Sequence, residues 1–134
     1  MTGLVVYPAV ESLVVAYLAR TLAARTDQVV VATKVPAPRP DRLVRVTAAG
    51  GGNDRFVLAS RLVIVECWDI REPGAADLAE LCHALLLAAR RDPAEPAIRN
   101  TVTVGAPVNH PDPDTHHARY QCTVSIDLRG RPPE

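Results

Sequence analysis

The segment Leu62–Trp68 constrains the fold most strongly, because six of its seven residues are apolar. A short run rich in β-branched residues favours a strand over a helix. A strand that is apolar on both faces has to be covered on both sides. We therefore expect a central strand, covered by the chain's own helices or by another subunit. Glu66 interrupts the run, and an unpaired buried carboxylate is costly, so we expect it to face an arginine of the same or a neighbouring subunit.

Two segments have the apolar spacing of amphipathic helices. The first is expected over residues 9–25, where Pro8 suits the start of a helix. The second is the clearest element of the chain. It is expected to start near Pro73 and to end before Asp92 and Pro93, because proline cannot continue a helix.

The remaining apolar segments predict five strands. The last of them alternates apolar residues with polar ones, which indicates one buried face and one wet face. We expect the strands at residues 28–35, 42–49, 55–69, 99–105 and 119–129. The resulting order, α-β-β-β-α-β-β, predicts an α+β fold: a mostly antiparallel sheet of consecutive hairpins with two helices packed on it.

Turn and loop signals complete this picture. Gly50–Asp54 is expected to form a hairpin turn, and a bulge is expected near Ser60 in the return strand. Prolines hold residues 36–41 extended. Residues 106–118 are expected to be a second loop, rich in proline and histidine. The length of 134 residues fits a single domain over 1–134, with a loose tail at 130–134.

Composition argues against several classes of function. The 15 basic and 15 acidic residues give zero formal net charge, whereas nucleic-acid binders usually carry a basic excess. The sequence has no secretory signal pattern and no apolar run near the roughly 20 residues that span a bilayer. The three cysteines are widely separated and lie in apolar patterns. We expect a soluble intracellular protein with reduced core cysteines, no membrane contact and no sequence-specific nucleic-acid partner.

The residues from His110 to His117 form the most suggestive chemical cluster. Three histidines and two aspartates within eight residues are potential ligands of a divalent metal ion. The prolines on either side of Asp112 favour another interpretation, an exposed loop whose aspartates cap backbone amides. A small metal- or ligand-binding protein using residues 110–117 stays open as an alternative. The other polar clusters match no known catalytic geometry, so we expect no enzyme activity and no cofactor.

Long ordered loops in small domains usually bind something. We therefore expect the two proline-rich loops to contact partner molecules or neighbouring subunits. The predicted interface residues are charged or polar side chains: Arg39, Asp41, Asp112, Asp114, His116 and His117 in the two loops, and Arg55 after the glycine turn.

The order of the segments resembles one protein family. It begins with the helix Val10–Leu18 and continues with Val35-Pro36, Pro40–Val46, the Gly50–Gly52 turn, Val63–Trp68, Ala75–Ala79, Pro111–Thr115, Arg119-Tyr120 and Leu128–Gly130. Over nearly its whole length the chain is similar to the tail terminator proteins of long-tailed (siphovirus-type) bacteriophages, especially phages of actinobacteria. The succession of segments carries the resemblance, since each piece alone is unspecific.

The resemblance implies a small α+β subunit of a hexameric ring. Such a ring caps the tail tube, stops its polymerisation and presents a surface to the head connector. It implies other copies of the chain, the major tail tube protein and the head–tail connector as partners, with DNA passing through the ring. The protein would be made in the cytoplasm of the host bacterium and reside at the tail–neck junction of the virion. Neck, tail-completion and head-closure proteins share similar patterns and remain alternatives.

Overall fold

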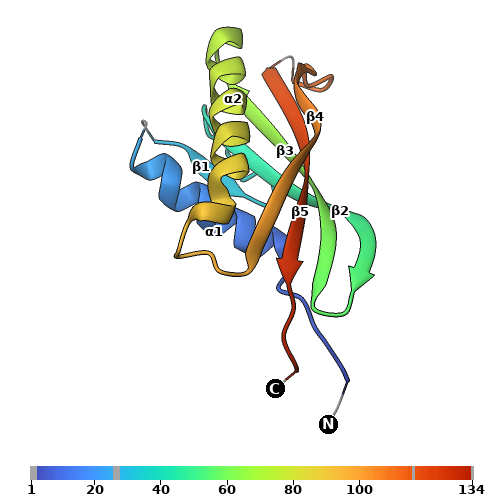
Figure 1. Ribbon diagram of the computed structural model, residues 1–134. Coiled ribbons are helices and arrows are strands. Elements are labelled where there is room, and N and C mark those ends of the chain that lie inside the picture. Colours follow the sequence, from blue (N-terminus) through green and yellow to red (C-terminus); the bar gives the residue numbers. More distant parts are fainter. Residues whose placement is uncertain (1–2, 26–27, 116, 134) are drawn as a thin grey trace.

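The computed structural model describes residues 3–25, 28–115 and 117–133. It confirms the α+β class, with two α-helices and a five-stranded sheet (Figure 1). The elements are α1 (Val10–Ala23), β1 (Val30–Ala32), β2 (Leu43–Arg55), β3 (Leu58–Asp69), α2 (Glu72–Ala88), the short 3-10 helix η1 (Ala89–Arg91), β4 (Ile98–Asn109) and β5 (Ala118–Arg129).

The strands lie in the order β1-β2-β3-β5-β4, so β3 is central, as its apolar sequence predicts. Three of the four strand pairs are antiparallel. The pairing of β1 with β2 is parallel, so the expectation of consecutive hairpins is wrong for this pair. The physical reason lies in the proline-rich segment 33–42. It carries the chain back along the sheet before β2 begins, so that β1 and β2 run in the same direction.

Both helices pack on the same face of the sheet (Figure 1). α1 lies over β1 and β2, whereas α2 lies over β3, β4 and β5. Between helices and sheet is one aliphatic core, which includes Leu18, Val65 and Leu86. β5 confirms its predicted alternation, because its core-facing side chains from Cys122 to Leu128 are buried and those between them are partly exposed.

The predicted turn at Gly50–Asp54 is wrong. β2 continues through these residues, and the chain turns at Phe56 and Val57. The glycines instead form an irregular stretch of β2, where the register with β3 shifts on both sides of Gly51 and Gly52. The bulge expected near Ser60 in β3 is therefore wrong: the irregularities lie in β2, on both sides of the Gly52–Ser60 pair, while β3 pairs with β5 without interruption.

Two boundaries also differ from expectation. β4 extends to Asn109, so the second loop is shorter than 106–118. Pro107 fits within β4 because an edge strand can dispense with one amide donor. The tail expected to be loose is held at its start. The Gly130 amide donates to the Val57 carbonyl, and Arg131 pairs with Val6 of the N-terminal segment, which runs beside it (Figure 1).

The irregular stretch of β2 generates a stability prediction. Gly51 has φ of 129°, and a Cβ there would meet the Ser60 carbonyl and come within 2.9 Å of the Arg61 Cα. Gly51→Ala should lower the free energy of unfolding by about 1–3 kcal/mol. Gly52→Ala is the matched control, since a Cβ at Gly52 meets open space. Urea denaturation of both variants measures the difference, and equal stabilities would contradict the proposed constraint.

Candidate interaction surface

The face of the sheet opposite the helices carries an unexpected cluster at one end. Side chains of a strand alternate between faces, so Glu66 and Trp68 point away from the helices, whereas Val65 and Cys67 point toward them. Trp68 is nonetheless only 1% exposed. It is covered by its neighbours in what we call the Trp68 cluster, which consists of Trp68, Glu66, Asp112, Arg39, Arg45 and Arg119.

Glu66 is paired within its own chain. The strand register places Arg45 of β2 directly opposite it, and Arg119 of β5 opposite Trp68. One carboxylate oxygen of Glu66 accepts from the Arg45 Nε at 2.7 Å, and the other accepts from an Arg119 guanidinium nitrogen at 3.1 Å. This confirms the expected arginine partner and locates it in the same subunit. A carboxylate this buried keeps its charge at low cost only with such partners.

Three guanidinium groups surround the indole of Trp68. Those of Arg39, Arg45 and Arg119 lie 5.2, 5.6 and 5.5 Å from the ring centroid. These distances are within the range of a cation–π interaction. The aliphatic stems of arginines can also cover apolar surface while their heads stay with acids. Arginine side chains and a loop aspartate thus shield Trp68, where no described helix covers it.

Asp112 connects the two loops to this cluster. One of its oxygens accepts from the Trp68 indole at 3.3 Å and from Arg39 at 3.2 Å, and the other accepts from the Asp114 amide at 3.0 Å. Burial of the carboxylate raises its pKa. The hydrogen bonds from Asp114, Trp68, Thr115 and Arg39 outweigh burial and hold the pKa of Asp112 well below its usual range. Residues 33–42 and 110–115 are thereby held at the same end of the sheet.

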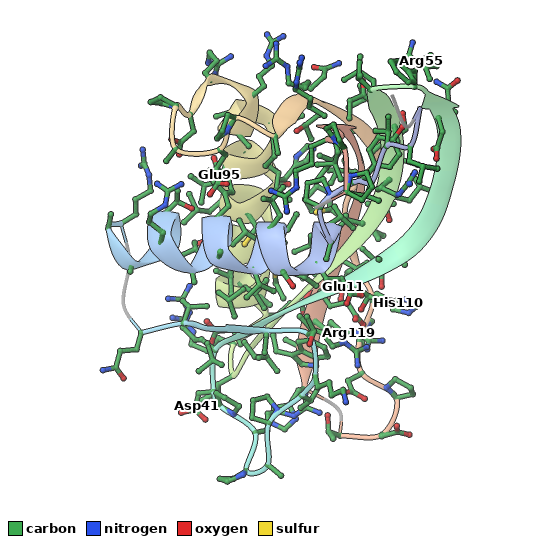
Figure 2. The ribbon with its side chains drawn as sticks, turned by 90° about the horizontal axis from the view of Figure 1, so that it is seen from below. Glu11, Asp41, Arg55, Glu95, His110 and Arg119 are labelled. Carbon is green, nitrogen blue, oxygen red and sulfur yellow. The ribbon has the colours of Figure 1, made fainter. Side chains whose placement is uncertain are left out.

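The structure brings some of the predicted interface residues together and separates others. Arg39 and Asp112 form an ion pair with each other. Asp41, Asp114 and His117 are exposed on the loops. Arg55 lies at the opposite end of β2, far from Asp41 (Figure 2). His116 is outside the described residues.

Beyond the Trp68 cluster, the same face of the sheet is partly apolar and carries little charge. In one cross-strand row Ile64 lies between Thr47 and Thr123, and in the next Leu62 is followed by Ser125 and Val102. We call these six residues the open face. Each is partly or fully exposed. The flanking charges are satisfied internally, since Glu66 is ion-paired and Asp127 accepts from Ser60 at 2.7 Å.

The tip of the β2–β3 hairpin carries a residue that sequence analysis missed. Phe56, the only phenylalanine of the chain, is 68% exposed and has φ of 59°. The Tyr7 hydroxyl donates to its carbonyl, and the tip projects beyond the rest of the sheet (Figure 1). A bulky side chain at a left-handed turn position is unusual. The expectation that the glycines formed the turn placed Phe56 inside a strand and hid this feature.

All three cysteines are free and buried, and burial raises the pKa of the Cys122 thiol to about 12. Among the described residues, no three histidine, cysteine or acidic side chains are placed to hold a metal ion. No helix within the described ranges is long and apolar enough to cross a membrane.

Comparison with known proteins adds no relative. The chain matches no protein-family model, and no curated protein is significantly similar to it.

The Asp112 contacts predict a pH-dependent stability difference. Asp112→Asn leaves Arg39 without its carboxylate and should lower the free energy of unfolding by about 1–3 kcal/mol at neutral pH. The folded pKa of Asp112 lies below the unfolded value of about 3.9, so its contribution is complete above that value and fades as pH falls below it. The deficit of the variant should therefore be constant above about pH 5 and shrink below about pH 4.

Urea denaturation between neutral and acidic pH measures this difference. The exposed Asp114 supplies the control, because Asp114→Asn keeps the backbone amide that donates to Asp112. A deficit that does not change with pH would show that the ionised carboxylate is not what stabilises the loops.

Proposed function

We propose that the protein is a structural subunit that assembles with copies of itself into a ring, and that the ring caps the tail tube of a long-tailed bacteriophage. The open face is the observation that carries the proposal. It is a sheet surface of low charge, with Leu62 and Ile64 at its centre, and both described helices lie on the other side. Such a surface loses little solvation when a protein partner covers it.

The size of the open face argues for an interface that extends past it. A stable protein interface buries about 800 Å² on each partner and uses roughly 20–30 residues. Six side chains are too few, so a partner has to reach the neighbouring strand edge or the loops as well. A second copy of the chain meets this requirement, because every subunit carries the same strand edge, open face and loops.

The two ends of the sheet are chemically different, as a capping ring requires. A ring that stops a polymer has to match it on one side and must not repeat that surface on the other. One end presents the loops fixed by the Trp68 cluster, with Asp41 and Asp114 exposed. The other end presents Arg55 and Phe56 at the hairpin tip. In this proposal one end contacts the major tail tube protein and the other contacts the head connector.

The ordered resemblance to tail terminators supports the same assignment. The proposal needs shape complementarity and satisfied polar groups, with no catalytic residue and no cofactor. It places the protein at the tail–neck junction, with DNA passing through the ring. A neck or tail-completion protein would use the same surfaces, and the phenotype of a deletion separates the two.

A phage that lacks this protein should assemble normal heads that do not join to tails. Its tails should be abnormally long or variable in length, because nothing stops the growth of the tube. Electron microscopy of the lysate measures both properties. Tails of uniform normal length joined to heads would overturn the proposal, whereas free tails of normal length would reassign the protein to the neck.

The hairpin tip provides a second test, by complementation of the deletion. Phe56→Asn removes an exposed aromatic anchor, and asparagine tolerates the left-handed backbone, so folding should be unaffected. Loss of such an anchor should lower the titre of joined particles by at least about tenfold. Leu87→Gln is the control, because Leu87 is an exposed residue of α2, which lies on the other face of the sheet. Full complementation by a stably folded Phe56→Asn protein would remove the tip from the interface.

A further inference from the structure

We propose that the free edge of β4 pairs with β1 of a second copy, so that the sheet continues from one subunit to the next. This inference rests on the proposed ring and specifies its subunit interface. β1 and β4 are the two outer strands of the sheet. An outer strand leaves backbone donors and acceptors that another strand can use.

The β4 edge lacks the charges that usually protect such strands. Residues 100–109 contain no acidic or basic side chain, and Val102 and Val104 are 52% and 59% exposed. Proteins commonly protect an exposed edge with lysine, proline or bulges. In β4 the register shifts and Pro107 limit the regular edge to Asn100–Thr103, four consecutive residues paired with β5. Three of these four residues are β-branched, and Val102 and Thr103 are exposed.

The β1 edge matches it in length and polarity. β1 has three residues, Val30–Ala32, and residues 28–33 carry no charge. The Val30 amide donates to the Arg42 carbonyl at 3.2 Å. Successive amides of a strand point to opposite sides, so the amide of Val31 faces away from β2. A three-residue strand therefore fits within the four-residue regular edge of β4. Pairing of the two edges would not require the desolvation of any charged side chain from residues 28–33 or 100–109.

Strand direction supports the same pairing. When a second copy lies beside β4 with its helices on the same side of the sheet, its β1 runs antiparallel to β4, as the pairings across the sheet require. Antiparallel ladders are slightly more stable than parallel ones. The contact is heterologous and can repeat until a ring closes, whereas pairing of β4 with β4 would end at a dimer. The open face would then continue across the subunits.

Cysteine cross-linking in the full chain tests the pairing. The native cysteines are buried, so Val30→Cys and Val102→Cys supply the accessible thiols. With a bis-maleimide at high protein concentration, the double variant should give a ladder of covalent oligomers beyond the dimer. Each single variant should give none. Dimers from Val102→Cys alone would instead indicate symmetric β4 pairing and would overturn the proposal.

Two further variants test the same edges without added thiols. Val102→Lys places a charge in the interface and should weaken self-association by at least about tenfold. Val31→Pro removes the outward amide and should weaken it similarly. Leu87→Lys is the control on α2. Native mass spectrometry of all variants and of the unchanged protein decides the matter. Oligomers that persist in both edge variants overturn the edge pairing and leave the ring intact, whereas a deletion phage with normal tails would overturn the ring function itself.

Discussion

The ion pairs of Glu66 with Arg45 and Arg119 are the interaction on which the side of the sheet opposite the helices depends. Glu66 lies on the central strand, where an unpaired carboxylate would be severely unfavourable. Its partners come from the strands on either side, so the pairs connect β2, β3 and β5. The same guanidinium groups lie beside Trp68 and let it be buried where no described helix reaches. Trp68 in turn holds Asp112, and Asp112 holds both loops.

This chain of contacts divides the outer side of the sheet into two regions. One region contains the charges of the Trp68 cluster, which are paired with each other and hold the two loops. The other region, the open face, has few charges and remains accessible. A small domain with zero net charge can thus order its loops through ionic contacts and still keep a weakly polar surface for association. Charges placed on the open face would have raised the cost of covering it.

The sequence predicted those elements whose pattern reflects burial directly. The helix at 72–88, the central position of Leu62–Trp68 and the alternation of β5 follow from apolar spacing, and so does the need of Glu66 for an arginine. Each of these features depends on whether a side chain is buried or exposed to solvent. The periodicity of apolar residues along the sequence reflects that burial directly.

The features that were missed depend on where distant segments meet. Glycines at Gly50–Gly52 suit a turn as well as an irregular strand, and only the close approach of Ser60 decides between them. The parallel pairing of β1 depends on the path of the proline segment. The ion pair of Arg39 with Asp112 joins two loops 73 positions apart, which no local pattern encodes. Charged loop residues suggested contacts to partners, and the structure uses two of them internally.

The open face and the β4 edge complement each other physically. An added strand at β4 would satisfy backbone groups but bury little apolar area by itself, since only about four residues are regular. The open face supplies side-chain area but no direction, because apolar contact is not directional. Backbone pairing at the edge would fix the orientation of a neighbouring copy, and that orientation would decide which residues the open face meets. The exposed edge strand would thus be the element that turns a weakly polar sheet surface into a specific interface.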